Sequence, residues 1–457
     1  MISIGVLPYE VLLAIFDLYM DEARIEAWQL LAHVCRRWRS VVFGSPRRLK
    51  LRLICRTETP ARDTLDIWPA IPLLIQGSIC LAEDVDNIIA ALECSDRVAK
   101  IKLFTNNVDS SPWEKVFEAM QEPFPELTDL DLHSYAETAP IAPDSFLGGS
   151  APNLRTLSLN HIPFPGLQKL LLSATHLVTL DLRQIPHSGF FSPDALSTLT
   201  SLDSLESLRL EFESHLSRPD RASRRPPPPK RSVLPALINF EFKGVSEYLD
   251  DLVARIDAPQ LNCLQITFFN QLVFDTPQLI QFINRTPTFK ALEEARVNFT
   301  DRAAIVYLSS HIPGFGPLRF EILCYEFGWQ VSSVEQVFSS CLPPLSTLKD
   351  LTFNEYWDVL NWQDYIENVL WLELLRPFPA LKHLFLNEAF GRRIAPALQE
   401  VVVGGRSTEV LPTLGNICLK DYQPSGQSVP VPEGIQQFVG ARQLTSHPVD
   451  VSCWDIR

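Results

Sequence analysis

A six-residue apolar pattern recurs from residue 98 almost to the end of the chain. In each copy the first, fourth and sixth residues are mainly apolar. The copies are VAKIKL from Val98, LTDLDL from Leu127, LRTLSL from Leu154, LVTLDL from Leu177, LESLRL from Leu205, LINFEF from Leu237, LNCLQI from Leu261, LEEARV from Leu292, LRFEIL from Leu318, LKDLTF from Leu348, LKHLFL from Leu381, LQEVVV from Leu398 and LGNICL from Leu414. The fourth and sixth residues share one side of an extended chain, so each copy predicts a strand with one buried face.

The spacing of the copies indicates the kind of repeat. The fourth positions of the first seven copies, from Ile101 to Leu264, lie 23 to 32 residues apart. This is the period of leucine-rich repeats, in which each unit is a strand plus a helix or turn and stacked units share one core. We therefore predict an α/β fold with an irregular leucine-rich-repeat solenoid and a curved parallel sheet. The alternative is an unrelated α/β fold in which the pattern arises by chance.

Two stretches depart from this regularity. LKHLFL, LQEVVV and LGNICL follow one another at steps of 17 and 16 residues, which are too short for a helix between strands, so we expect hairpin-like or loop connections there. Residues 217–232, SRPDRASRRPPPPKRS, are basic and contain four consecutive prolines. Such a run favours polyproline II or disorder, and we expect an exposed insertion. The alternative is a peptide docking site or a localisation signal.

Composition excludes several classes of protein. Hydrophobic residues make up 46% of the 457 residues, enough for a large core, and the net charge of -14 argues against broad nucleic-acid binding and against a membrane-surface role. No apolar run approaches the ~18 residues of a membrane span. The nine cysteines are scattered without a C-x-x-C spacing, which suits a reducing compartment and gives no zinc pattern. We expect no metal and no cofactor.

The first 50 residues predict three short helices. Pro8 suits a first helical turn, apolar residues from Val11 onward recur at helical spacing, and Gly44 with Pro46 ends the third helix. So small a unit cannot bury all of its apolar residues by itself. Some of them must face either the rest of the chain or a partner, and the sequence leaves both possibilities open.

The order of residues in this segment resembles the F-box motif. A Leu-Pro start at Leu7, an Ile-Phe pair at Ile15 and a late Val-Cys-Arg-Arg-Trp run from Val34 occur in the family's order. The following RRLKLRLIC and ARDTLDIWPAIPLLI are similar to the large F-box family of mushroom-forming (basidiomycete) fungi. The alternative is a plain helical cap on the next domain.

The resemblance implies a docking module at residues 4–48, with residues 49–457 left to the repeats. F-boxes bind a Skp adaptor, which links them to a cullin-RING ubiquitin ligase, and the expected compartment is the cytoplasm, the nucleus or both. Skp adaptors are acidic, which matches the arginines of this segment. The resemblance assigns adaptor binding to Leu7, Pro8, Ile15, Phe16, Val34, Arg36, Arg37 and Trp38.

No catalytic motif accompanies these features: the sequence has no G-x-S-x-G, P-loop, G-x-G-x-x-G or H-E-x-x-H pattern. We therefore predict a non-catalytic substrate-recognition subunit of a Skp-cullin-F-box (SCF) ubiquitin ligase. The alternative is a repeat scaffold that binds proteins outside any ligase. Target-binding residues are expected at the outward-facing fifth positions of the strands, namely Lys102, Asp131, Asp181, Arg209, Glu241, Gln265, Arg296, Thr352 and Phe385.

Overall fold

The computed structural model divides the chain into two compact units. The first is Met1–Gln184 and the second is Ile185–Arg457. The structure describes residues 7–22, 26–57, 60–106, 110–186, 202–215, 231–271, 273–310, 318–343, 345–355, 366–420, 430–445 and 447–454. Most of the predicted basic insertion, up to residue 230, lies outside these ranges.

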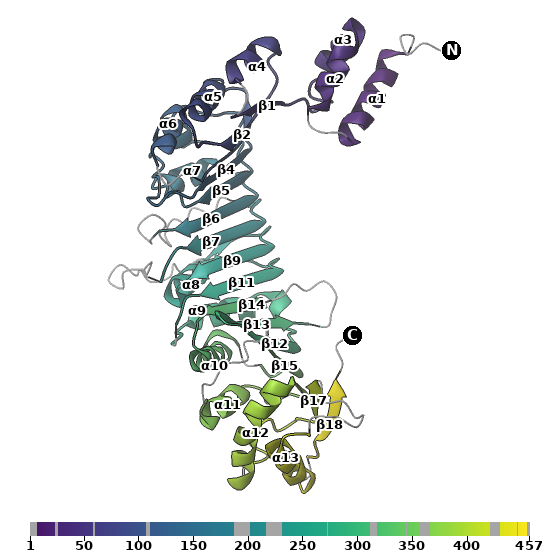
Figure 1. The fold of residues 1–457 in the computed structure, drawn as a ribbon, viewed down its shortest axis with the longest axis vertical. Helices are drawn as coiled ribbons and strands as arrows, with labels where there is room; N and C mark the ends of the chain where they lie inside the picture. Colours follow the sequence, from purple (N-terminus) through teal and green to yellow (C-terminus); the bar gives the residue numbers. More distant parts are fainter. Residues whose placement is uncertain are drawn as a thin grey trace. The chain divides into compact units, whose positions relative to one another are not determined.

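Three helices open the first unit, as the sequence predicts. They are α1 (Tyr9–Glu22), α2 (Ala27–Val34) and α3 (Arg36–Gly44) (Figure 1). Cys35 separates the last two because its backbone is extended, with φ at -161°. The Cys35 Sγ accepts a hydrogen bond from the backbone N–H of Trp38 at 3.5 Å, so the side chain caps the start of α3.

The sheet of the first unit is parallel and follows chain order. Its strands are β1 (Leu53–Arg56), β2 (Leu73–Ser78), β3 (Val98–Thr105), β4 (Asp129–Ser134), β5 (Thr156–Asn160) and β6 (Thr179–Ile185). Neighbouring copies of the pattern are in register, since Ile101 pairs with Leu130, Leu130 with Leu157 and Leu157 with Leu180. These four residues are buried, so the fourth position of each copy forms a continuous apolar row.

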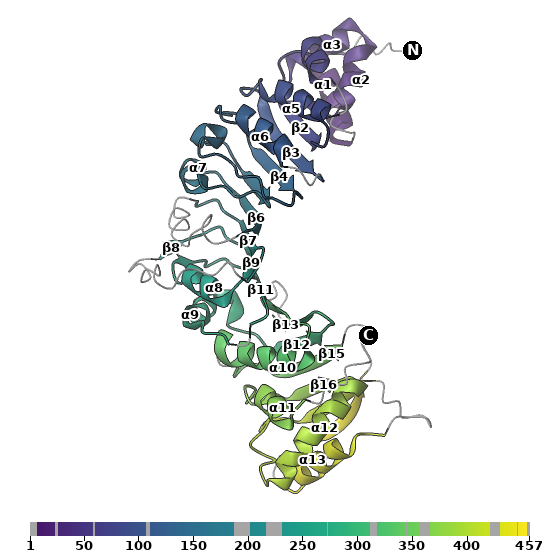
Figure 2. The same ribbon diagram turned by 60° about the vertical axis from the view of Figure 1, so that its left-hand side comes forward.

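Helices of the first unit cover one face of this sheet. They are α4 (Ala61–Ile67), α5 (Ala82–Leu92), α6 (Ser111–Ala119), α7 (Leu167–Ser173) and the short 3-10 turn η2 (Phe146–Gly149). Figure 2 shows α5, α6 and α7 on the same side of the strands. The strand face opposite the buried residues carries the fifth positions of the repeats, and we call it the outward face.

The second unit repeats this architecture. Its described strands lie in the order β7 (Ser207–Phe212), β9 (Asn239–Gly244), β11 (Cys263–Phe268), β14 (Leu318–Leu323), β13 (Ala303–Ser309), β12 (Glu294–Phe299), β15 (Asp350–Glu355), β16 (His383–Leu386), β17 (Asn416–Lys420) and β18 (Asp450–Trp454). Two short strands, β8 (Ser232–Val233) and β10 (Ile256–Asp257), pair separately. The helical segments are α8 (Ser246–Val253), α9 (Pro277–Arg285), η6 (Pro287–Phe289), α10 (Phe327–Gln336), η7 (Val337–Cys341), α11 (Asn368–Leu375), α12 (Glu388–Val403) and α13 (Glu433–Gln443).

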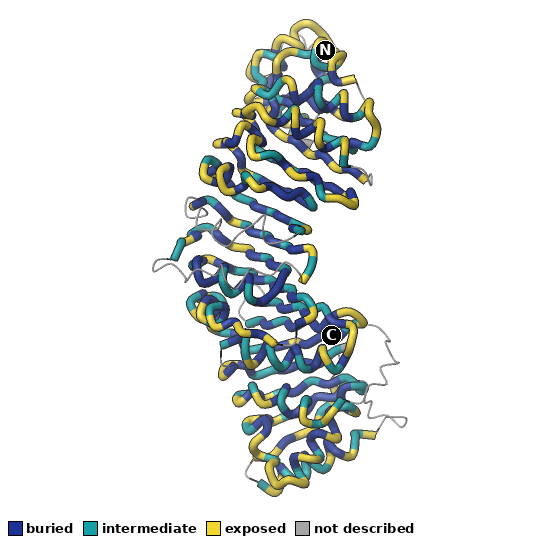
Figure 3. Tube along the Cα trace, turned by 90° about the vertical axis from the view of Figure 1, so that its left-hand side faces the viewer, coloured by how far each residue is buried: buried dark blue, intermediate teal, exposed yellow. Residues whose placement is uncertain are grey.

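The predicted solenoid of strand-plus-helix repeats is confirmed in both units. Along strands such as β4, β7 and β11, buried residues alternate with partly exposed ones. Figure 3 shows buried residues throughout the strands of each unit. The alternation follows from the fourth and sixth positions of the pattern, which point into the core together.

A reversed strand interrupts the parallel sheet of the second unit, which the sequence analysis did not predict. LEEARV and LRFEIL were expected as successive parallel repeats, but β13 lies between them, antiparallel to both β12 and β14. The connection from β12 to β13 is a tight turn in which Thr300 and Ala303 exchange hydrogen bonds. A turn this short cannot hold a crossover, so the next strand must run back.

Buried polar side chains of α10 bind the chain at the ends of the strands near β13. Gln330 is fully buried on α10, and its Nε2 donates to the backbone carbonyls of Thr300 at 2.9 Å and Cys324 at 2.7 Å. Ser333, one helical turn further on, donates to the carbonyl of Gln271 at 3.1 Å. These bonds satisfy backbone carbonyls of the connections between strands.

The prediction for the last repeats is wrong at LQEVVV. This copy lies inside α12 rather than on a strand, and Leu398 and Val401 are buried there at helical spacing. An i, i+3 pair of apolar residues fits a helix as well as it fits the strand pattern. The connection from β16 to β17 is therefore an ordinary helical crossover, not a hairpin or loop.

A half-buried carboxylate makes the stability of the second unit sensitive to pH. Asp250 on α8 accepts hydrogen bonds from the backbone N–H groups of Gln278 and Leu279, at 2.8 and 3.0 Å, at the start of α9. Burial raises the pKa of Asp250 from 3.8 to about 6 despite these two bonds, with a smaller contribution from Asp251 and Asp275. The folded state thus holds this proton more tightly than the unfolded chain.

The Asp250→Asn variant is expected to be more stable than the wild type at pH 7, by about 1 kcal/mol after allowance for partial exposure. In the wild type, the stabilisation that comes from protonated Asp250 is fully present below about pH 4 and is lost as pH rises through 6. The reason is that the pKa of Asp250 is higher in the folded state than in the unfolded chain. The amide keeps the acceptor oxygen and removes the charge. Thermal unfolding of both proteins at pH 4 and pH 7 measures the effect. An equal difference in Tm at the two pH values would contradict it.

Candidate protein-binding surfaces

Apolar side chains on the N-terminal helices are exposed to solvent. Ile15 on α1 is 46% exposed and Val34 at the end of α2 is 59% exposed. Val11 and Leu18 on α1 and Leu30 on α2 are exposed as well. Clusters of exposed apolar side chains on a small helical unit are typical of surfaces that another protein covers.

The residues that the sequence assigns to adaptor binding differ in accessibility. Pro8, Ile15, Val34, Arg36 and Arg37 are exposed, and Leu7 and Trp38 are half-buried. The Arg37 guanidinium donates to the backbone carbonyl of Leu7, which ties the chain before α1 to α3.

Phe16 is an exception, because only 1% of it is exposed. Its ring packs edge-on against the ring of Trp38, with 4.8 Å between centroids. Phe16 therefore cannot contact a partner directly and instead supports Trp38.

The other side of the helical unit packs against the rest of the chain. Trp28 is fully buried, its Nε1–H donates to the carbonyl of Arg52 at 2.8 Å, and its ring meets Trp68 edge-on at 4.9 Å. Phe43 of α3 lies within 5.9 Å of Trp28 and 6.4 Å of Trp68, measured between ring centroids. The apolar residues of the three N-terminal helices therefore divide into two groups: some pack against the rest of the chain, and others face solvent.

Ion pairs line the outward face of the first unit. Lys102, Asp131, Ser158 and Asp181 occupy matched positions on β3 to β6. Lys102 Nζ lies 3.1 Å from an Asp131 oxygen, and Arg183 binds Asp181 through two nitrogens, at 2.9 and 2.5 Å. Three of the predicted target-binding residues are therefore already engaged with neighbours on the same face.

Asp131 is held in its ionised form. Burial alone would raise its pKa, but the hydrogen bond from His133 at 2.5 Å, the charge of His133 and the bond from Lys102 outweigh it and lower the pKa to about 2. A fixed charge with fixed donors is the kind of group that recognises a partner by complementarity.

A longer row follows the outward face of the second unit. Matched positions run through Arg209, Glu241 and Gln265, and then through Arg319, Tyr307 and Arg296 to Thr352 and Phe385. Arg319 and Tyr307 did not appear among the predicted residues. They enter the row because the reversed strand brings β14 and β13 between β11 and β12.

The prediction is wrong for Thr352 as an accessible contact residue. Its position in the row is outward, but only 4% of it is exposed. Arg296 and Phe385 flank it on the neighbouring strands. A short side chain between two long ones is covered by them.

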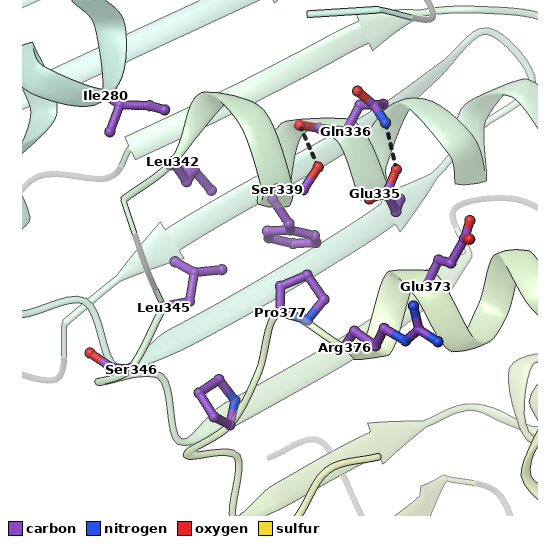
Figure 4. A pocket seen from close by; sticks show the side chains of 12 residues that line it. Ile280, Glu335, Gln336, Ser339, Leu342, Leu345, Ser346, Glu373, Arg376 and Pro377 are labelled. Carbon is purple, nitrogen blue, oxygen red and sulfur yellow. Dashed lines mark hydrogen bonds between the residues drawn. The ribbon is translucent and has the colours of Figure 1, made fainter. Parts of the chain in front are cut away.

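A pocket of about 740 Å³ lies among helices α9, α10 and α11 of the second unit (Figure 4). Its lining is Ile280, Glu335, Gln336, Phe338, Ser339, Leu342, Leu345, Ser346, Glu373, Arg376, Pro377 and Pro379. The Ser339 hydroxyl donates to the Gln336 carbonyl at 3.4 Å, and no histidine or cysteine is among the lining residues. The lining offers no nucleophile paired with a base.

The described part of the chain has no group of three or more histidine, cysteine, aspartate or glutamate side chains that could hold a metal ion. It also has no helix that is long and apolar enough to cross a membrane.

The comparison with protein families identifies the N-terminal segment. Residues 4–55 match the F-box-like family model. The chain carries an F-box-like domain at its N-terminus. This domain comprises α1 to α3 and the start of β1, and it contains the exposed apolar residues described above.

Comparison with solved structures finds distant likenesses. The leucine-rich repeat-containing protein LegL7 from Legionella pneumophila is 12% identical, with a TM-score of 0.27, and the match covers 85% of this chain and 97% of that one. A chain of the yeast Rad7 and Elc1 complex is 14% identical, with a TM-score of 0.28 and 94% coverage of both chains. The search of curated proteins finds no match.

Proposed function

We propose that this chain is the substrate-recognition subunit of an SCF ubiquitin ligase. The F-box-like domain would bind a Skp adaptor, and the repeats would bind a target protein. The observation that carries the proposal is the match of residues 4–55 to the F-box-like family, together with the exposed apolar side chains of α1 and α2. A cullin-RING ligase would join through the adaptor.

Such a subunit needs no chemistry of its own. It raises the effective concentration of the target near the ubiquitin carrier, and the transfer takes place on other subunits. The contact of Trp28 with Trp68 supports this role, because it holds the helices against the segment that leads into the repeats. A firm joint between the two would limit the range of positions that a bound target can occupy.

The outward faces of the repeats are the proposed target-binding surfaces. On the first unit they present Lys102, Asp131 and Asp181, and on the second Arg209, Glu241, Gln265, Arg296 and Phe385. Individual exposed ion pairs contribute little to stability, about 0 to 1 kcal/mol each. Their regular arrangement is better suited to recognising a partner than to stabilising the fold.

Paired replacement of Ile15 and Val34 by aspartate is expected to weaken binding of a Skp adaptor at least ~100-fold, because each change puts a charge into an apolar contact. Titration of purified adaptor into the full chain by calorimetry measures this. Ile67→Asp on α4 is the matched control: Ile67 is 71% exposed but lies outside the F-box-like domain, so its replacement should leave binding unchanged.

The alternative is a repeat scaffold that acts outside any ligase. It predicts that the wild-type chain binds no Skp adaptor at concentrations where known F-box proteins do. That result would exclude the proposed function and leave the repeat surfaces as binding sites of another assembly.

A further inference from the structure

The reversed strand creates a feature that a regular repeat array would not have. Tyr307 on β13 pairs in register with Arg319 on β14 and with Arg296 on β12. The Arg319 guanidinium lies 5.7 Å from the centre of the Tyr307 ring. Two guanidinium groups and a phenol hydroxyl therefore occupy adjacent positions on the outward face. We call these three residues the Arg-Tyr-Arg row.

The donors of this row are only partly used. A guanidinium carries five N–H donors. Arg319 binds Glu321 through Nη2 at 2.7 Å and Gln265 through Nη1 at 3.4 Å, while its Nε is buried without a partner among the described residues. Among the described residues, Arg296 makes one bond, from Nη2 to Glu294 at 3.2 Å, and the Tyr307 hydroxyl makes none.

Each of the two neighbouring carboxylates already accepts two hydrogen bonds. Glu321 accepts from Arg319 and, at 3.5 Å, from the hydroxyl of Thr267. Glu294 accepts from Arg296 and, at 3.4 Å, from the hydroxyl of Ser309. A basic ligand would have to compete with arginines that these carboxylates already bind. An acidic ligand can use the N–H groups of exposed Arg296 that have no partner among the described residues, together with the Tyr307 hydroxyl.

We propose that the Arg-Tyr-Arg row binds carboxylate side chains of an acidic segment in the target protein. The inference rests on the proposed function, in which the repeats hold the target. Charge-assisted hydrogen bonds from guanidinium to carboxylate are among the stronger polar contacts, and a planar fork suits the two oxygens of one group. Tyr307 adds a neutral donor between the two charges.

The test uses a fluorescently labelled polyglutamate peptide and the full chain, with binding followed by anisotropy. Combined Arg296→Gln and Arg319→Gln replacement is expected to weaken peptide binding at least ~10-fold. This is the lower end of the range of affinity losses expected when a charge-assisted hydrogen bond is removed. Tyr307→Phe, which removes only a hydroxyl, should weaken peptide binding a few-fold. Polylysine should not compete.

The matched control is combined Arg392→Gln and Arg406→Gln, which removes the same charge from exposed arginines on α12 and just after it. It should leave binding unchanged. Equal loss in the two double variants, or no effect of either, overturns the proposal, and so does displacement of the peptide by inorganic phosphate but not by free glutamate. Tyr307→Phe keeps the test decisive if the double variant fails to fold.

Adaptor binding is measured on the same preparations. Normal adaptor binding without polyglutamate binding would reject the acidic-segment inference and leave the proposed function standing. Failure of the wild-type chain to bind the adaptor would instead reject the proposed function.

Discussion

Replacing Gly434 by alanine is expected to destabilise the second unit by about 3 kcal/mol or more. A Cβ at this position would lie 2.1 Å from the carbonyl oxygen and 2.7 Å from the carbonyl carbon of Ala395. Both atoms belong to the backbone of α12, so no side chain can rotate away. Helix α13 would have to move off α12, and the buried residues Ile435 and Phe438 would lose their packing.

The neighbouring Gly440 supplies the control. It lies on the same helix, and a Cβ there meets no atom within 4 Å. Gly440→Ala should therefore stabilise the protein by up to about 1 kcal/mol, since alanine favours a helix over glycine. Urea unfolding of the full chain, monitored by hydrogen exchange of amides in α12 and α13, measures the stability of both variants. Similar stabilities for the two variants would show that the backbone of α12 does not lie this close to Gly434 on α13.

Trp28→Ala is expected to cost the first unit about 4 kcal/mol, the usual range for removal of a fully buried tryptophan. The variant loses the ring contacts with Phe43 and Trp68 and leaves the Arg52 carbonyl without its donor. Because these contacts join the F-box-like domain to the following segment, amides of α2 and α3 should exchange much faster. Hydrogen exchange measured by mass spectrometry on the full chain reports this directly.

Two further variants separate the causes. Trp28→Phe keeps much of the ring volume and loses the Nε1–H donor, so it should cost less, about 1 to 2 kcal/mol. Trp329→Ala removes a tryptophan that is 42% exposed in the second unit, and exchange in α2 and α3 should not change. If Trp28→Ala leaves exchange in α2 and α3 unaltered, these helices are not held by the aromatic contacts.

The regular part of the fold follows from local sequence pattern. The fourth and sixth positions of copies such as LTDLDL and LVTLDL are buried on β4 and β6, as the period-two alternation predicts. The three N-terminal helices were predictable for the same reason, because helical spacing and the stop at Gly44 are features of neighbouring residues. Such patterns act within one element and need no knowledge of distant contacts.

The errors lie where one pattern fits two structures. LQEVVV satisfies both the repeat pattern and one face of a helix, and the packing of Leu398 and Val401 decides for α12. LEEARV and LRFEIL are strands, as predicted, but their order in the sheet depends on the short turn after Phe299. A strand's direction is set by the length of the connection before it, which the repeat pattern does not contain.

The candidate sites show the same division. Outward positions such as Lys102 and Arg209 could be assigned from the alternation of each strand, but the burial of Thr352 depends on its neighbours across the sheet. Phe16 matched the motif and is buried against Trp38. No feature of the sequence predicted that Leu18 and Leu30 would be exposed, because apolar residues on a short helix fit a buried core equally well.

The sequence by itself determined the repeat architecture, the helical N-terminal segment and its resemblance to the F-box, because each depends on the spacing of residues close together in the chain. Tertiary structure alone decided which apolar residues of that segment meet Trp68 and which meet solvent. It also placed Tyr307 between Arg319 and Arg296. These outcomes depend on segments far apart in sequence, and no local pattern encodes which of them become neighbours.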